Sequence, residues 1–237
     1  IEDGHLVGNV TVTEERAKAE DWTISNVAVL PEYRGRGIAG RLVDTALAHV
    51  RSRGGRRVFL QVRSDNVTAL SLYRRRGFRT YDTQSELELP RHGWPVSIGS
   101  ASRPLRRVRP ADQDALYALF LASTPQGVLE QRPIQARQFG RGLGWQLRQA
   151  QRLFTQGQQS LELVGEDPSA AKPGAIVAYG ALTTYLSRGP YELDLRVLPG
   201  QRGQWEVIVI ESLLDLAGNS PHQRVRSYVS ASHPEAA

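Results

Sequence analysis

The first ninety residues alternate between strand-like and helix-like spacing of apolar side chains. Residues 6–12 alternate apolar and polar positions, which predicts a strand, and residues 22–30 predict the strand that returns beside it. Pro31 ends this second strand because proline has no N–H to give to the ladder. A helix is predicted next, since apolar residues follow at four-residue steps at Ile38, Leu42, Ala46 and Val50. Further strands are predicted over residues 57–63 and 78–89, with a short helix between them.

The segment between the second strand and the helix has the composition of an anion-binding loop. It reads Arg34-Gly35-Arg36-Gly37-Ile38-Ala39-Gly40. Gly37 and Ala39 lack bulk, so the backbone can approach a ligand closely. A helix that begins here leaves its first N–H groups unpaired, and these donors and the helix dipole favour an anion. On its own, such a Gly-x-Gly loop is more often only a tight turn.

A second segment of interest follows the strand at residues 57–63. Asp65-Asn66 can cap a short helix that contains Tyr73, and Gly77 ends that helix. A tyrosine hydroxyl can donate a proton to a leaving group. Taken alone, Tyr73 is more often a half-buried aromatic residue with its hydroxyl in water.

Together, the two segments resemble the GNAT superfamily of acetyl-CoA-dependent N-acetyltransferases, over residues 1 to about 89. The pyrophosphate loop of that family has the pattern Arg/Gln-x-x-Gly-x-Gly/Ala, which Arg34-x-x-Gly37-x-Ala39 fits. The sequence pattern from Leu60 to Asn66 is most similar to that of the branch that acetylates protein N-termini, such as ribosomal-protein alanine acetyltransferases. The resemblance implies an α/β fold with a mixed central sheet flanked by helices, and acetyl-CoA as the co-substrate.

The resemblance also implies the site residues. Tyr73 corresponds to the proton donor for the CoA thiolate, which leaves after a neutral amine has attacked the thioester. Main-chain groups near Val29 bind the pantetheine arm and stabilise the charge that develops on the thioester oxygen. The expected contacts to the cofactor are Val27, Val29, Arg34, Gly35, Arg36, Gly37, Ile38, Ala39, Gly40 and Asn66.

One position departs from the family pattern. Gln61 stands where the N-terminal acetyltransferase branch commonly carries a glutamate base, and glutamine cannot take up a proton at neutral pH. The base is therefore expected to be a water held by main-chain oxygens, a carboxylate such as Glu2 or Asp3, or a residue outside this sequence. The acceptor is expected to be a primary amine, either on a small molecule or at a protein N-terminus.

The second half of the chain resembles a diverged repeat of the first. Leu198-Pro199-Gly200-Gln201-Arg202-Gly203 repeats Leu30-Pro31-Glu32-Tyr33-Arg34-Gly35 at an offset of 168 (199 − 31), and residues 225–236 echo residues 58–69 at an offset of 167. Gly180 echoes Gly8 in the same order. At these offsets Gly37 becomes Trp205, Ala39 becomes Val207 and Asn66 becomes His233. The two larger side chains near position 205 are expected to fill the space that a pyrophosphate needs.

These patterns predict two tandem GNAT folds. Residues 1–89 are expected to be the catalytic, acetyl-CoA-binding domain without its N-terminal part, and residues 104–237 a degenerate second domain without its C-terminal end. Residues 90–103, with prolines, glycines and serines, are expected to form the linker. The full protein is expected to extend beyond both ends, and the two domains to pack on each other.

The second domain is expected to open with a strand at Leu105 and a helix from Asp112 to Phe120. Arginines near this strand alternate with apolar residues, which favours a solvated strand face over a nucleic-acid patch: Arg103, Arg106, Arg107 and Arg109.

Composition narrows the class of protein. No apolar run of the 237 residues approaches the roughly 20 needed to cross a bilayer, so no membrane partner is expected. The chain has no cysteine, which excludes a disulfide scaffold and a cysteine nucleophile, and its five histidines lack ligand-like spacing, so no metal is expected. Its net charge of +6 favours an anionic ligand such as CoA. We expect a cytoplasmic N-acetyltransferase; the alternative is a catalytically decayed CoA-binding or interaction protein.

Overall fold

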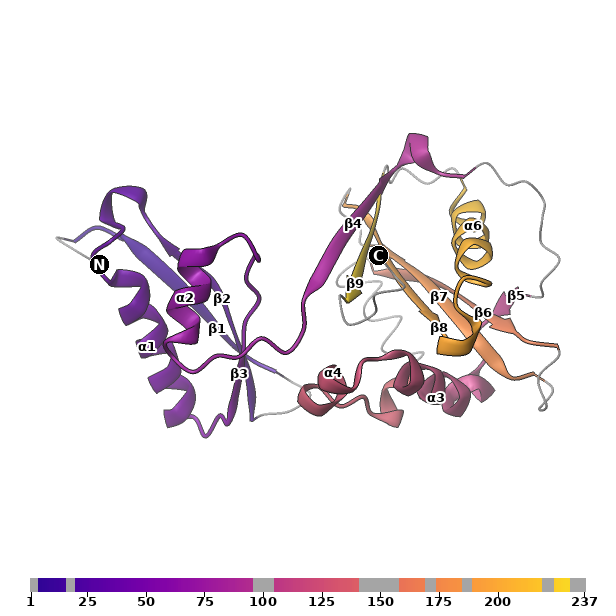
Figure 1. Cartoon of the computed structure of the whole chain (residues 1–237), viewed down its shortest axis with the longest axis horizontal. Helices are drawn as coiled ribbons and strands as arrows, with labels where there is room; N and C mark the ends of the chain where they lie inside the picture. Colours follow the sequence, from indigo (N-terminus) through magenta and orange to yellow (C-terminus); the bar gives the residue numbers. More distant parts are fainter. Residues whose placement is uncertain are drawn as a thin grey trace. The chain divides into compact units, whose positions relative to one another are not determined.

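The structure is a computed structural model that describes residues 4–15, 20–95, 105–140, 158–168, 174–184, 189–218 and 224–230. Contacts between residues divide the chain into two compact units, residues 1–79 and residues 80–237. Figure 1 shows the elements of each unit. In the described residues, both units combine a mixed sheet with helices.

The first unit has a three-stranded sheet with the order β1-β2-β3. β1 (Gly8–Glu14) pairs antiparallel with β2 (Asp21–Val29), and β2 pairs parallel with β3 (Arg57–Phe59). Two helices complete the unit, α1 (Ile38–Ser52) and α2 (Val67–Arg74). The predicted helical stripe is confirmed, because Ile38, Ala46 and Val50 are buried and α1 packs on β1 and β2.

β3 is shorter than the strand predicted over residues 57–63, and so is its parallel pairing with β2. Only Asp21–Thr23 and Arg57–Phe59 pair, whereas β2 continues to Val29 and residues 60–66 leave the sheet. Two hydrogen bonds from Arg57 to the Asp21 carboxylate, at 2.8 and 2.7 Å, fix the paired end. The two strands therefore separate toward the end of β2 that leads into the glycine loop.

The second unit has a six-stranded sheet with the order β4-β9-β8-β7-β6-β5. Its strands are β4 (Gln84–Pro90), β5 (Leu105–Arg107), β6 (Gln159–Glu166), β7 (Ile176–Thr184), β8 (Tyr191–Val197) and β9 (Arg224–Ser230). Among these described strands, β8 and β9 pair in parallel and every other neighbouring pair is antiparallel.

Helices cover both faces of this sheet (Figure 1). α6 (Glu206–Ala217) packs Val209, Leu213 and Leu214 on one face. On the other face α3 (Gln113–Ser123) packs Leu116 and Leu119. β7 is buried over seven consecutive residues for this reason, since a strand covered on both faces needs no alternation of polar residues. A short helix, α4 (Gln126–Gln131), follows α3.

β4 was expected within residues 78–89 as the last strand of the first domain, but it lies in the second sheet. It pairs antiparallel with β9 over all seven of its residues. Arg226 also reaches Glu86 across the pair at 2.8 Å. The boundary between the units therefore lies after Arg79, not after residue 89.

The segment expected to open the linker also packs in the second unit. Arg91 donates a hydrogen bond to the main-chain oxygen of Gly218 at 2.7 Å and lies over the Trp94 ring, 4.0 Å from its centroid. Trp94 in turn packs beside Tyr191, with ring centroids 6.4 Å apart. The rest of the expected linker, residues 96–103, lies outside the described residues.

β5 and α3 confirm the predicted opening of the second domain, but Arg106 does not lie on a solvated face. Its guanidinium donates two hydrogen bonds to Asp112, at 2.7 and 2.8 Å, and one to Glu166 at 2.6 Å. Its side chain is 20% exposed and that of Asp112 is 8% exposed. Arg106 is therefore part of a half-buried ion-pair network that joins β5 to β6.

The structure confirms the internal repeat. Short 3-10 helices at Pro31–Tyr33 and Pro199–Gln201, and the helix starts at Ile38 and Glu206, share the offset of 168. The strand register corrects one detail. Gly8 pairs with Val29 whereas Ala178 pairs with Val197, so Ala178 rather than Gly180 is the counterpart of Gly8.

Candidate active site in the first unit

The glycine loop connects the end of β2 to the N-terminus of α1. Gly35 and Gly37 have φ angles of 77° and 75°, a region that side chains disfavour. Gly37 is the N-cap residue, and no side chain caps the helix. The first hydrogen bond of the helix runs from the Arg41 N–H to the Gly37 oxygen at 3.1 Å, so the N–H groups of Ile38, Ala39 and Gly40 precede it.

The outer side of this loop is open and positively charged. A Cβ atom placed on Gly35 or Gly37 would meet nothing within 4 Å. Arg34 folds back to the Val29 oxygen (3.1 Å), and Arg41 reaches the Arg36 oxygen (3.4 Å). No acidic residue lies in the first turn of α1. The loop thus combines main-chain N–H groups that precede the helical hydrogen bonds, a helix N-terminus and three arginines, as an anion site requires.

A β-bulge interrupts β2 shortly before the loop. Between the pairs Asn9–Ala28 and Thr11–Ser25, β1 has one residue and β2 has two, Asn26 and Val27. Asn26 has a φ of 50°, and its side chain donates to the Thr11 hydroxyl at 3.3 Å. The Asn9 amide donates to the Asn26 main-chain oxygen at 3.0 Å. The bulge takes main-chain groups of Asn26 and Val27 out of the regular ladder, beside the point where β2 and β3 separate.

The family resemblance implies a cofactor contact at Val27 but none at Asn26. The available signal was an asparagine inside an otherwise strand-like run, because asparagine tolerates left-handed φ angles better than most residues.

Tyr73 lies on α2, behind the helix N-cap formed by Asn66. The Asn66 side-chain oxygen accepts a hydrogen bond from the Ala69 N–H at 3.0 Å, as the sequence predicts. Tyr73 is 8% exposed and packs edge-on against Phe78, with ring centroids 5.8 Å apart. Burial raises the pKa of the Tyr73 hydroxyl above its usual value, so the side chain is a neutral phenol at neutral pH. This is the form that can donate a proton.

An ion pair holds the Tyr73 helix against the loop helix. Arg76, one turn after Tyr73, donates two hydrogen bonds to Asp44 of α1, at 2.7 and 2.9 Å. The Arg76 guanidinium covers Gly40, where an added Cβ atom would come within 2.5 Å of the Arg76 Nη2 atom. Gly40 thus serves the packing of α1 against α2, and the ion pair fixes Tyr73 relative to the loop.

The general base stays a prediction. Gln61 is exposed on the segment that follows β3. Glu2 and Asp3, the carboxylates considered for this role, lie outside the described residues.

The copy of the loop in the second unit differs in its chemistry, but not in the expected way. Trp205 is the N-cap residue of α6 and is only 1% exposed. Its indole lies in the core against Gly165, where a Cβ atom would overlap the ring. Val207 is 65% exposed. The expectation that the Trp205 indole fills the phosphate space is therefore wrong. His233, the counterpart of Asn66, lies outside the described residues.

The loop of the second unit differs from that of the first in its charge and in the geometry of the preceding strand. The α6 helix carries Glu206 in its first turn, and the Glu206 carboxylate accepts a hydrogen bond from the Trp205 N–H at 3.2 Å. β7 and β8 pair in continuous register from Ala178–Val197 to Thr183–Glu192, without the bulge that Asn26 makes in β2. The second copy thus lacks both the positive loop and the irregular strand.

Within the part of the chain that the structure describes, no helix is long and apolar enough to cross a membrane. Among those same residues, no group of three or more His, Cys, Asp or Glu side chains is arranged to hold a metal ion.

Residues 1–78 match the sequence model of the acetyltransferase (GNAT) family. The chain is 39% identical over 77 residues to "N-alpha-acetyltransferase RimI" of Mycobacterium tuberculosis, covering 32% of this chain and 47% of that protein. It is 34% identical over 77 residues to a "Putative [ribosomal protein bS18]-alanine N-acetyltransferase" of Bacillus subtilis, covering 32% and 49%. It is 42% identical over 52 residues to a "Mycothiol acetyltransferase" of Corynebacterium glutamicum, covering 22% and 18%. The chain spans less than half the length of each of these relatives.

Solved structures resemble the chain over nearly its whole length. A "Tandem GNAT protein from the clavulanic acid biosynthesis pathway" matches with a TM-score of 0.60 at 13% identity, covering 97% of this chain and 72% of that one. A GCN5-related N-acetyltransferase from Sphaerobacter thermophilus matches with a TM-score of 0.64 at 17% identity, covering 96% and 69%. At these identities the likeness shows the fold alone.

Proposed function

Because residues 1–78 match the sequence model of the acetyltransferase (GNAT) family, we propose that the protein is an N-acetyltransferase that transfers an acetyl group from acetyl-CoA to a primary amine. The observation that carries the proposal is the open, positively charged loop at the N-terminus of α1, where Gly35 and Gly37 leave the main chain accessible. The relatives named above are acetyltransferases by their printed names, which supports the same reaction class.

The loop would hold the pyrophosphate of acetyl-CoA. The N–H groups of Ile38, Ala39 and Gly40 supply donors, and Arg34, Arg36 and Arg41 supply charge. These residues fit such a group, because an anion at a helix N-terminus is favoured by both the free donors and the helix dipole.

Other residues of the first unit are proposed to carry out the chemical steps of acetyl transfer. Bound acetyl-CoA supplies the thioester carbonyl that a neutral amine attacks. The main chain at the Asn26–Val27 bulge lies out of the ladder and can donate hydrogen bonds to charge that develops on the thioester oxygen. Tyr73 then donates its proton to the departing sulfur, since its raised pKa keeps the hydroxyl protonated.

The acceptor is proposed to be a primary amine on a small molecule or at a protein N-terminus. Relatives whose printed names refer to ribosomal-protein alanine and to mycothiol both match part of the chain, so they support both classes. We propose that the second unit is a degenerate GNAT fold, because its copy of the loop carries Glu206 and its strand lacks the bulge.

The test combines calorimetry with acetyl-CoA and a thiol-release assay on a panel of amines and N-terminal peptides. Gly37→Trp should abolish acetyl-CoA binding, because an indole would stand in the open space over the first N–H groups of α1. Gly54→Trp is the matched control, since Gly54 lies at the other end of α1, also has a left-handed φ of 79°, and also faces open space. The control should bind acetyl-CoA normally.

Two outcomes would contradict the proposal. Normal acetyl-CoA affinity in Gly37→Trp would refute the loop as the cofactor site. Tight acetyl-CoA binding without turnover on any amine would favour the alternative, a CoA-binding protein with a decayed active site, for which Gln61 at the usual position of the base is the specific observation.

A further inference from the structure

The proposed proton donor, Tyr73, lies on a helix that is short and only lightly buried. Of the eight residues of α2, all of which the structure describes, Tyr73 alone is buried. The cofactor is proposed to lie at the N-terminus of a different helix, α1. Proton transfer therefore depends on how the two helices are held together, since a displacement of about 1 Å from the productive geometry can cost about 100-fold in rate.

Arg76 connects Tyr73 to α1 through both its main chain and its side chain. Its N–H donates to the Tyr73 main-chain oxygen at 2.9 Å. Its guanidinium donates to the Asp44 carboxylate at 2.7 and 2.9 Å, and to the Leu72 main-chain oxygen at 3.3 Å. Two charged hydrogen bonds to one carboxylate fix the orientation of a guanidinium. The Asp44 side chain is 59% exposed and that of Arg76 20%, so the link also depends on what packs around the guanidinium.

Gly40 provides that packing surface. It is buried, and it lies one turn before Asp44 on the same face of α1. The three atoms nearest to a Cβ placed on Gly40 would all belong to the Arg76 guanidinium. The guanidinium therefore lies against the first turn of α1, the turn whose N–H groups precede the first helical hydrogen bond.

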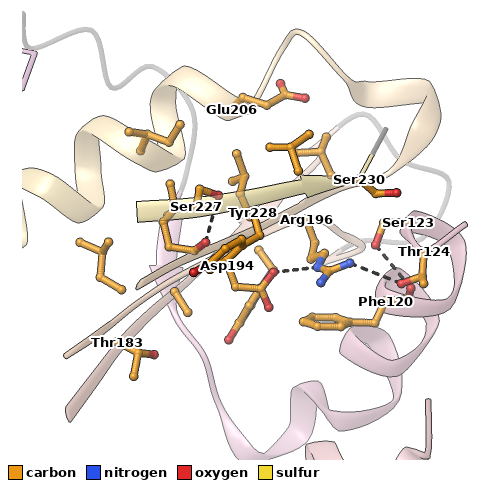
Figure 2. Close-up of a pocket in the computed structure, with 18 of the residues that line it drawn as sticks. Phe120, Ser123, Thr124, Thr183, Asp194, Arg196, Glu206, Ser227, Tyr228 and Ser230 are labelled. Atoms are coloured by element: carbon orange, nitrogen blue, oxygen red, sulfur yellow. Dashed lines mark hydrogen bonds and ion pairs between the residues drawn. The ribbon is translucent and has the colours of Figure 1, made fainter. Parts of the chain in front are cut away.

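The second copy of the loop and helix keeps neither residue that holds the guanidinium. At the offset of 168, Gly40 becomes Ile208 and Asp44 becomes Ser212. The first turn of α6 instead contributes Glu206 and Val207 to the wall of a cavity of about 1190 Å³ in the second unit, where Figure 2 shows Glu206. The link thus occurs in the copy that carries the proposed active site.

We propose that Arg76 is a positioning residue for Tyr73. Its guanidinium, held by Gly40 and Asp44, keeps the Tyr73 ring at a fixed distance from the turn of α1 that binds the cofactor. This inference rests on the proposed function, which makes Tyr73 the proton donor and the N-terminus of α1 the cofactor site. Loss of the link should lower kcat and leave acetyl-CoA affinity unchanged, because the main-chain donors of α1 are retained.

Gly40→Ala separates positioning from stability. The added methyl group first meets the end of a flexible side chain, and alanine is more favourable than glycine within a helix. The melting temperature should therefore not fall. Because the guanidinium is displaced, kcat should fall about three- to tenfold. A residue needed only for stability would give the opposite pattern.

Arg76→Gln removes the link itself, and kcat should fall about tenfold. The fall should not exceed the roughly 100-fold expected for Tyr73→Phe, because Arg76 acts through that hydroxyl. Arg75→Gln is the matched control and should keep the wild-type kcat. Arg75 is the exposed neighbour, and its guanidinium donates within its own helix, to the Ser71 hydroxyl at 2.7 Å. Calorimetry should give the same acetyl-CoA affinity for all three variants.

A double-mutant cycle tests whether Arg76 acts through Tyr73. In Tyr73→Phe there is no hydroxyl to position, so adding Arg76→Gln or Gly40→Ala should not lower kcat further. Damage that is independent of Tyr73 would lower kcat by the same factor in both backgrounds.

Three results would overturn the inference while the proposed function stands. These are a wild-type kcat in Arg76→Gln, a loss of kcat in Arg76→Gln that persists in full in the Tyr73→Phe background, and a loss of acetyl-CoA affinity in Gly40→Ala. Failure of the proposed function would look different. The wild type would then bind no acetyl-CoA or acetylate no amine, and both proposals would be refuted together.

Discussion

At the scale of single residues, the proposed active site depends on where a side chain is absent as much as on where one is present. Gly35 and Gly37 leave the main chain of the loop open, and Gly40 makes room for Arg76. Tyr73 contributes a buried hydroxyl whose pKa is raised by burial. These four positions are identified by residue type in the sequence, but the reason for Gly40 needs the contact with Arg76.

Removing the Tyr73 hydroxyl should lower turnover without affecting cofactor binding. In Tyr73→Phe we expect kcat to fall about 100-fold, the scale of a lost general acid, with unchanged acetyl-CoA affinity. A general acid is active below its pKa, so the wild-type kcat should decline as pH rises through the raised pKa of Tyr73, above the usual 10.0. The pH profile of kcat checks this, because that alkaline decline should be absent from the variant. An unchanged kcat in Tyr73→Phe would remove it from the catalytic role.

Asn26 should tolerate glycine and reject valine. Its φ of 50° is accessible to glycine but costs a β-branched residue on the order of 1–2 kcal/mol. Asn26→Val should therefore lower the free energy of unfolding by about that amount and reduce kcat, because the bulge would tend to regularise. Asn26→Gly keeps the backbone conformation and should retain most of kcat. Urea unfolding and steady-state kinetics measure the two effects, and equal kcat in the two variants would argue against a role for the bulge.

At the scale of elements, local patterns predicted what each segment becomes but not always which partner it takes. The strand, glycine loop and helix of residues 22–52 were predictable, because alternation, proline, glycine and four-residue spacing are all local signals. The membership of β4 in the second sheet was not, since its alternating residues fit any antiparallel edge. The orientation of Trp205 also depended on a distant residue, Gly165, which leaves space for the indole.

The Arg106 network should contribute to the stability of the second unit. Removing the guanidinium in Arg106→Gln leaves Asp112 and Glu166 without their shared donor, so the free energy of unfolding should fall by about 2–3 kcal/mol. Arg107→Gln, on the exposed neighbour in β5, is the control and should change it little. Chemical denaturation followed by tryptophan fluorescence measures the difference, which should be near zero if the network is fully solvated.

The Arg106 network should also make the stability of the fold depend on pH under acidic conditions. Burial tends to raise the pKa of Asp112, but hydrogen bonds from Arg106 and from the Arg109 N–H lower it overall, below the usual 3.8. A carboxyl group whose pKa is lower in the folded state than in the unfolded state stabilises the fold at pH values above its unfolded-state pKa. That contribution to stability is lost as pH falls below about 4. Denaturation midpoints measured from pH 5 to pH 2.5 should therefore fall less steeply in Asp112→Asn than in the wild type.

At the scale of the whole molecule, one supersecondary unit occurs twice, with a positively charged loop in the first copy and no net charge in the second. Both copies keep the strand, the short 3-10 helix and the helix start at a common spacing. Only the first combines left-handed glycines, arginines and a bulged strand, and only the second places a carboxylate at its helix N-terminus. A fold can be conserved through packing alone, so the two copies need not share a ligand.

Hydrogen exchange with peptide resolution can compare the two copies in one intact chain. Acetyl-CoA should slow amide exchange over residues 34–41, because the N–H groups that precede the first hydrogen bond of α1 would then donate to the pyrophosphate. It should leave residues 202–209 unchanged, since Glu206 already accepts the N-cap N–H and repels an anion. CoA without the acetyl group is the control and should protect the same peptides, because the loop binds the pyrophosphate. Protection of both loops would mean that the second copy still binds the carrier, and that the added carboxylate of Glu206 is insufficient to exclude it.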